Sequence, residues 1–123
     1  MEEQLVSYEV AKLAKEKGFN IPTKMCYGRY FPQLGFNNLY NSEFFAGDFS
    51  SYAPTQSLLQ KWLRDEKQLY VMCFHDYADR GTPDIWNPVN VWCWEVGGKD
   101  SDYKYTYEEA LEAGLLEALS LIK

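Results

Sequence analysis

Two cysteines and the single histidine of the chain could form a small site. Cys73 and His75 alternate along a strand-like stretch, so their side chains point to the same face of a sheet. Cys93, in the next strand-like segment, could join them, and thiolates with an imidazole are ligands that zinc prefers. However, no fourth ligand stands at a recognisable spacing, and free cysteines commonly pack as small apolar side chains. Packing is therefore the favoured interpretation, and we assign no metal and no cofactor.

The same residues suggest a second chemistry, nucleophilic catalysis by a cysteine. His75 would have to be the base, with Cys93 or Cys26 as the nucleophile. No glycine-rich turn that could form an oxyanion hole accompanies any of the three cysteines. Cys73 is a poor nucleophile candidate because it is so close to His75 on an extended strand. We assign no catalytic residue, and a non-enzymatic protein is favoured.

Three carboxylates lie in a turn-rich segment between the two strand-like stretches. Asp76, Asp79 and Asp84 surround Gly81, and carboxylates on a turn can hold calcium. Their spacing does not match an EF-hand loop, and Asp, Gly and Pro are the ordinary residues of turns. A solvated turn is the favoured interpretation.

Aromatic residues are the most unusual feature of the composition. The chain has ten Tyr, seven Phe and four Trp among 123 residues, and nine of these rings lie between Tyr27 and Tyr52. Rings dominate both cores and interfaces, and we expect more ring area than one small core can hide. The surplus predicts contact with a protein partner, or self-association as a homodimer. The candidate interaction residues are Phe36, Tyr40, Phe44, Phe45, Phe49, Tyr52, Trp92 and Trp94.

Three alternatives use the same rings differently. A small enzyme or binding domain would have a ligand pocket lined by Trp86, Trp92, Trp94 and Tyr77, if polar groups converge beside them. Exposed rings also stack on single-stranded nucleic acid, but the net charge of −6 and the scattered basic residues disfavour phosphate binding. Finally, the rings could close a second core layer beneath residues 32–53.

Three helices are predicted to position these residues: 8–17, 55–67 and one that begins at Thr106. Ser7 and Thr55 are suitable N-caps, and Thr106 with Glu109 forms a capping box. Gly114, in the apolar face of the third helix, indicates either close approach of a neighbouring element or a tolerated substitution. On the second helix the predicted water-facing residues are Gln56, Gln60, Lys61 and Arg64.

Strands are predicted at 24–31, 68–77 and 90–96, the last two pairing as an antiparallel hairpin. Residues 32–53 are predicted to form a long aromatic loop, with a short helix capped by Ser42 as the alternative. The order α-β-α-β-β-α favours one α+β domain over residues 1–123, with a small antiparallel sheet and helices packed on one face. Residues 1–4 are expected to be flexible.

Three helical segments carry a resemblance to known sequences: YEVAKLAKEKGF at 8–19, YAPTQSLLQKWLR at 52–64 and TYEEALEAGL at 106–115. They resemble a group of small uncharacterised proteins that phages and prophages of gut anaerobic bacteria encode. The resemblance covers a little over a quarter of the chain. It implies a setting in a bacterial host, and it implies no activity, cofactor or site residue.

Cysteine usage and charge predict the compartment. An odd number of cysteines without a CxxC motif is not a disulfide framework. The acidic start, MEEQ, is not followed by the apolar region of a signal peptide. No apolar run approaches the roughly 18 residues of a membrane helix. We therefore expect a protein of the bacterial host cytoplasm, with neither membrane nor nucleic acid as a partner.

Overall fold

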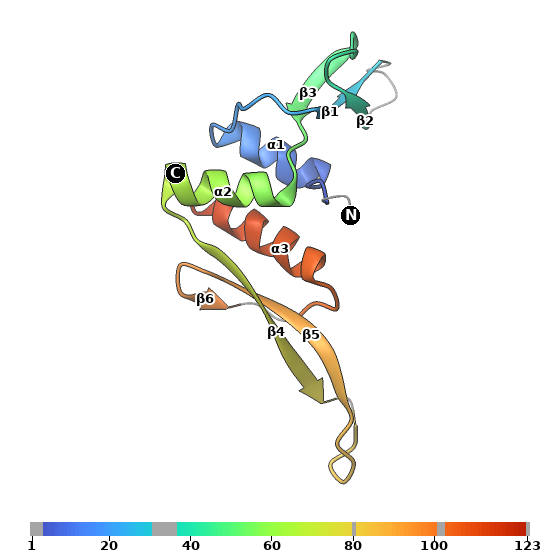
Figure 1. Cartoon of the computed structure of the whole chain (residues 1–123), viewed down its shortest axis with the longest axis vertical. Helices are drawn as coiled ribbons and strands as arrows, with labels where there is room; N and C mark the ends of the chain where they lie inside the picture. The colour runs from blue at the N-terminus through green and yellow to red at the C-terminus, as the bar shows by residue number, and fades with distance from the viewer. Residues whose placement is uncertain (1–3, 31–36, 80, 101–102, 123) are drawn as a thin grey trace.

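The structure, a computed structural model, describes residues 4–30, 37–79, 81–100 and 103–122. The fold is α+β, as predicted. In Figure 1 the helices lie between two small antiparallel sheets, one with strand order β2-β1-β3 and one with order β4-β5-β6. The elements, in chain order, are α1 (Tyr8–Glu16), β1 (Met25–Arg29), β2 (Asn38–Asn41), β3 (Asp48–Tyr52), α2 (Gln56–Lys67), β4 (Val71–Asp79), β5 (Pro88–Val96), β6 (Lys99–Asp100) and α3 (Tyr107–Ser120).

Side-chain caps start all three helices at the predicted residues. The hydroxyls of Ser7, Thr55 and Thr106 each accept a hydrogen bond from the backbone N–H three residues on, at 3.1 to 3.3 Å. Each bond satisfies a donor that the first turn of a helix leaves without an intrahelical partner. In the third cap, the Thr106 hydroxyl also donates to the Glu109 carboxylate at 3.0 Å. Local sequence is therefore enough to place these three starts.

The main core lies between the three helices and the base of the β4–β5 pair. Phe19, which follows α1, packs edge-on against Trp62 of α2 with ring centroids 5.4 Å apart. Gln56 was predicted to face water, and this prediction is wrong. The side chain is buried, and its Nε2 donates to the Glu108 carbonyl at 2.9 Å. The buried cluster consists of Val6, Val10, Ala11, Ala14, Phe19, Leu59, Trp62, Leu63, Val71, Trp94, Val96, Leu111, Leu115, Ala118 and Leu119.

Helix α3 packs on one face of the β4–β5 pair at a glycine. A Cβ added to Gly114 would lie 2.8 Å from Val71 Cγ1, closer than real Cβ contacts, and 3.1 Å from Trp94 Cβ, which is unusually tight. The close-approach interpretation of this glycine is therefore confirmed. The predicted antiparallel hairpin is also present, with nine consecutive pairs from Val71↔Val96 to Asp79↔Pro88.

The segment between α1 and α2 differs most from its prediction. One sheet was expected and two are present, because the described part of 32–53 contains two strands, β2 and β3, that flank β1. Ser42 caps no helix. Instead, its backbone N–H donates to the Lys24 carbonyl at 2.8 Å in the turn that follows β2. Both strands need β1 as a partner for their backbone groups, and such a long-range pairing leaves little trace in a local pattern.

The chain start was expected to be flexible over residues 1–4. Residues 1–3 lie outside the described residues. The Gln4 carbonyl accepts a hydrogen bond from the Gln56 N–H at 2.8 Å, and Leu5 forms an isolated β-bridge with Thr55. The described start of the chain is thus tied to the beginning of α2.

Candidate functional site

The β4–β5 pair extends well beyond the helices and forms a projecting arm. We define the arm as the described residues 74–79 and 81–91. In Figure 1 both strands continue away from the helices past the start of α3, toward the far end of the molecule. Among the described residues, the outermost backbone pairing of β5 with a third segment is the bridge between Trp92 and Lys104. Beyond it the described arm is a two-stranded ribbon, and such a ribbon is only marginally stable by itself in water.

One face of the arm carries a continuous row of rings. Tyr107, the first residue of α3, meets Trp92 edge-on at a centroid distance of 5.4 Å. Trp92 in turn meets His75 at 5.3 Å, and His75 meets Tyr77 at 4.8 Å. His75 Nε2 also lies 2.9 Å from the Asn90 side-chain oxygen. The row leads from the core boundary outward to Tyr77, which is 59% exposed.

The opposite face of the same ribbon is also apolar. Met72 and Phe74 are exposed there, because successive strand residues alternate between the faces. Tyr103 and Tyr105 flank the bridge at Lys104, which pairs with Trp92, so the two tyrosines lie on the Phe74 face. Their rings are 6.0 Å apart, and both are exposed. The ribbon therefore presents large apolar side chains on both faces.

The tip of the arm is ordered by one carboxylate. Asp79 Oδ1 accepts hydrogen bonds from the Asn87 N–H at 3.0 Å and from the Gly81 N–H at 2.9 Å. These two bonds, the one from Asn87 foremost, lower the pKa of the Asp79 carboxyl. A Cβ at Gly81 would collide with the Ile85 carbonyl, so this turn needs glycine. The ordered tip presents Trp86, which is 67% exposed, and the neighbouring Ile85.

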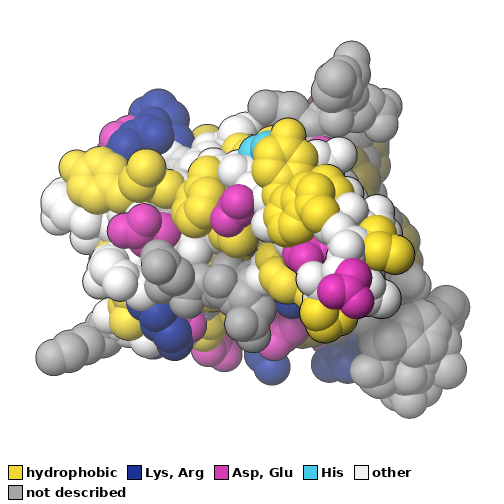
Figure 2. All heavy atoms as spheres, turned by 90° about the horizontal axis from the view of Figure 1, so that it is seen from below, with side chains coloured by type: hydrophobic (Ala, Val, Ile, Leu, Met, Phe, Trp, Pro, Cys, Tyr) yellow, Lys and Arg dark blue, Asp and Glu magenta, His cyan; other side chains and the backbone are white. Residues whose placement is uncertain are grey.

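Figure 2 views the molecule from the end where the arm projects. Hydrophobic side chains gather around the single histidine, His75, and carboxylates are interspersed among them. By sequence, residues 74–91 carry three aspartates against Arg80 alone. The surface is thus aromatic, with acidic side chains among the rings (Figure 2). Contiguous exposed apolar surface of this kind typically marks a binding site.

The two predicted tryptophans have different positions. Trp92 belongs to the ring row and is partly exposed. Trp94, the other predicted interaction residue of this strand, is only 8% exposed, so little of its ring is accessible to a partner. It lies beneath α3 at Gly114, one row closer to the core than Trp92. Sequence alternation puts both residues on one face, but only α3 decides which of them is covered.

The aromatic residues predicted at 36–52 form two small groups. Tyr40 and Phe45 stack with centroids 4.8 Å apart, and Phe45 covers the backbone at Gly28. Phe49 meets Tyr52 edge-on at 5.0 Å, and the Lys15 ammonium lies 5.5 Å from the Phe49 ring centre. These rings thus mostly pack against each other. Phe44 is the most exposed of them, and Phe36 lies outside the described residues.

Sequence reasoning did not assign the residues that shape the arm as interaction residues. These include Phe74, His75, Tyr77 and Trp86, although their alternation was visible. The signal that could have found them is an alternating apolar pattern on both faces of a strand next to a long turn. Such a strand is buried on both faces in most folds.

The cysteines and His75 do not form the site that their spacing suggested. Cys73 and His75 share the face covered by α3, whereas Cys93 pairs with Phe74 and so points to the opposite face. Among the described residues, no group of three potential metal ligands comes together. Burial raises the pKa of the Cys73 thiol to about 11 and also raises that of Cys26. Raised pKa values leave little reactive thiolate at neutral pH.

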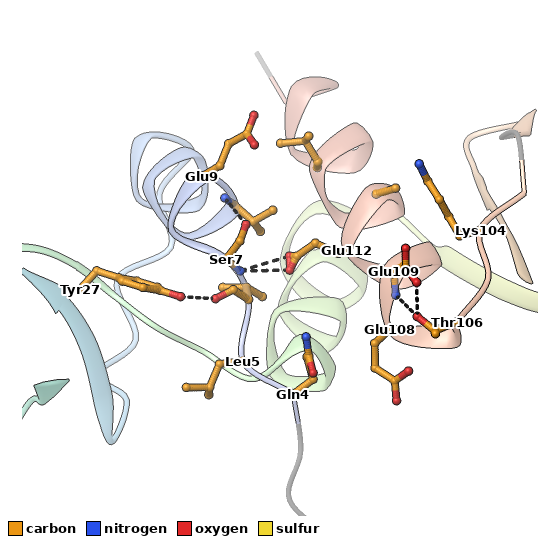
Figure 3. Close-up of a pocket in the computed structure, with 14 residues that line it drawn as sticks. Gln4, Leu5, Ser7, Glu9, Tyr27, Lys104, Thr106, Glu108, Glu109 and Glu112 are labelled. Carbon is orange, nitrogen blue, oxygen red and sulfur yellow. Dashed lines mark hydrogen bonds between the residues drawn. The ribbon is translucent and has the colours of Figure 1, made fainter. Parts of the chain in front are cut away.

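A pocket of about 730 Å³ lies at the junction of the chain start, α1 and α3 (Figure 3). At its centre the Glu112 carboxylate accepts hydrogen bonds from the Ser7 N–H at 3.1 and 3.2 Å. Burial raises the pKa of Glu112 despite these bonds. Glu9, Glu108 and Glu109 also line the pocket, so its walls are acidic. Its lining includes none of the tryptophans that would make the predicted aromatic pocket.

No protein-family model, no curated protein and no solved structure matched the chain. Within the described part of the chain, none of the helices has both the length and the apolar composition that a bilayer-spanning helix requires.

Proposed function

We propose that this chain is a non-enzymatic accessory protein that uses the arm to bind a protein partner, either another protein or a second copy of itself. The observation that carries the proposal is the position of the rings. Tyr77 and Trp86 lie on a two-stranded ribbon beyond the cover of the helices. A ribbon of this kind gains stability when a third element covers one of its faces. Tyr and Trp are also the residues that most often anchor protein interfaces.

The charge of the arm favours a protein over a nucleic acid as the partner. With three aspartates and Arg80 in residues 74–91, the arm would repel a phosphate backbone. The setting that we propose is a phage or prophage function in the cytoplasm of a bacterial host. The resemblance of the three helical segments supports this setting. The alternative, a ligand-binding domain or enzyme with a pocket beside Trp86, Trp92 and Trp94, has less support because the pocket of Figure 3 lies elsewhere.

Affinity capture with paired variants tests the proposed function. The immobilised chain is incubated with lysate of a bacterial host, and retained proteins are identified by mass spectrometry. The double variant Tyr77→Ser/Trp86→Ser removes the anchors of the arm, and we expect it to lose the specifically retained proteins. Phe44→Ser is the matched control, since Phe44 is equally well exposed but lies at the opposite sheet. Equal retention by the arm variant and the control would contradict the proposal.

A further inference from the structure

We propose that the partner of the arm is a second copy of this chain, which pairs antiparallel along the free edge of β4 about a two-fold axis. This inference rests on the proposed function, because it takes the arm to be a protein-binding surface. It adds the identity of the partner, the element that makes the contact and the symmetry of the complex.

Strand β4 is an edge strand that is capped at its start, where Gln60 Nε2 of α2 donates to the Val71 carbonyl at 2.7 Å. The sheet order is β4-β5-β6, and among the described strands β4 pairs only with β5. Natural edge strands are blunted by Lys, Pro, bulges or short length. Val71–Asp79 is nine residues long, contains no Lys, Pro or Gly, and pairs with β5 without a register shift. In contrast, β2 has four residues, and the register of β3 with β1 shifts at Tyr27.

The exposed apolar area on the β4 side reaches the lower end of what a specific dimer requires. A whole aromatic side chain has roughly 200 Å² of surface. Weighted by their exposed fractions, the large side chains of β4 and the tip present on the order of 600 Å². Specific interfaces bury about 1,200 Å² in total or more, which is about 600 Å² on each partner. The side chains concerned are Met72, Phe74, Tyr77, Ile85 and Trp86.

Antiparallel self-pairing also brings complementary charges together. Antiparallel pairing centred on His75 places Asp79 of one copy beside Val71 of the other. There the Asp79 backbone would replace Gln60 Nε2 as the partner of the Val71 carbonyl. Val71 borders a groove of about 230 Å³ between α2 and β4, and Arg64 is the charged residue among those that line it. The acidic tip of each arm would therefore lie beside Arg64 of the other copy. The two-fold axis repeats this contact, so the interface is self-complementary.

The test compares the association of three forms of the full chain by sedimentation velocity up to about 100 μM. An interface of this size corresponds to a Kd of ~1 μM or tighter, so we expect the native chain to be a dimer at the highest concentrations. Met72→Lys places a charge on the edge strand, at a side chain that is 58% exposed, and should weaken association at least tenfold. Leu39→Lys is the control, because Leu39 is an exposed apolar residue of the other sheet, and it should leave the Kd unchanged.

A measurement on the native chain complements the variants, in case Met72→Lys does not fold. Hydrogen exchange of the β4 amides should slow as the concentration rises through the Kd, while exchange in β2 stays constant. A monomer at about 100 μM, where micromolar interfaces are populated, would overturn the inference. So would a dimer that both lysine variants retain. If the chain is a monomer and its arm still captures another protein, this inference is contradicted but the proposed function is not. A dimer that the Tyr77→Ser/Trp86→Ser variant retains would contradict both.

Discussion

His75 and Trp92 face each other across the β4–β5 ladder, with ring centroids 5.3 Å apart, in the row where the cover of α3 ends. One row closer to the helices, Cys73 faces the buried Trp94. One row farther out, Tyr77 faces Asn90, and both are exposed. The pair thus marks the boundary between a sheet that completes the core and an arm that extends from it.

The packing of α3 on the sheet depends on Gly114. In an exposed helix, Gly→Ala stabilises by about 1 kcal/mol. Here the added methyl would lie 2.8 Å from Val71 Cγ1, so overpacking should outweigh the gain in helix propensity. We expect Gly114→Ala to lower the free energy of unfolding by roughly 1 kcal/mol, and Gly114→Val by more. Urea unfolding followed by circular dichroism measures both values, and a stabilised Ala variant would refute the close packing.

Trp86 should be the most solvent-accessible tryptophan of the chain. It is 67% exposed at the tip, whereas Trp62 of α2 is 8% exposed and packs edge-on against Phe19. We expect Trp86→Phe to remove most of the fluorescence that acrylamide quenches readily, and to shift the remaining emission to shorter wavelength. Trp62→Phe should leave the readily quenched component intact. If both variants are quenched to the same extent, the tip is not exposed as described.

Glu112 should make stability depend on pH. Burial raises its pKa in the folded chain, so the native state holds the proton more tightly than the unfolded chain does. The associated stability is present below the ordinary Glu pKa of about 4.3 and is lost as the pH rises through the raised value. Glu112→Gln keeps an oxygen that can accept from Ser7 and cannot ionise. The free energy of unfolding of this variant, relative to the native chain, should therefore increase as the pH is raised from 4 to 7.

The unfolding free energies of the native chain and Glu112→Gln at low pH serve as the reference for this prediction. At a pH below the ordinary Glu pKa, residue 112 is uncharged in both proteins, so the difference measured there reflects the substitution alone. A difference that stays constant over the whole range would show that Glu112 titrates as it does in the unfolded chain.

Cys73 should react slowly with alkylating reagents. With a pKa of about 11 it has roughly 10²-fold less thiolate at pH 8 than a free cysteine. Iodoacetamide labelling followed by peptide mass spectrometry should show Cys73 modified slowly in the folded chain and rapidly in denaturant. Labelling at the rate of a free thiol would contradict the burial and would reopen the question of a cysteine nucleophile.

The sequence by itself determined the local features of this fold. Ser7, Thr55 and Thr106 cap the predicted helices, since an N-cap needs only a side-chain oxygen and the next turn of the same helix. The hairpin of β4 and β5 also followed from two alternating stretches and the turn between them. For Gly114 the pattern left two interpretations open, close approach of a neighbouring element or a tolerated substitution, and the contacts with Val71 and Trp94 favour the first.

Only the tertiary structure decided which rings are covered. The alternation in the sequence places Trp92 and Trp94 on the same face of β5. Helix α3 covers Trp94, whereas Trp92 contacts Tyr107, the first residue of this helix. Likewise, the rings of 36–52 pack on a sheet that exists because β1 pairs with two distant strands. The burial of Gln56 depends on the Glu108 carbonyl of another helix. A side chain becomes buried through contacts between segments that are far apart in the chain. Residue spacing indicates only on which face of its own helix or strand a side chain lies.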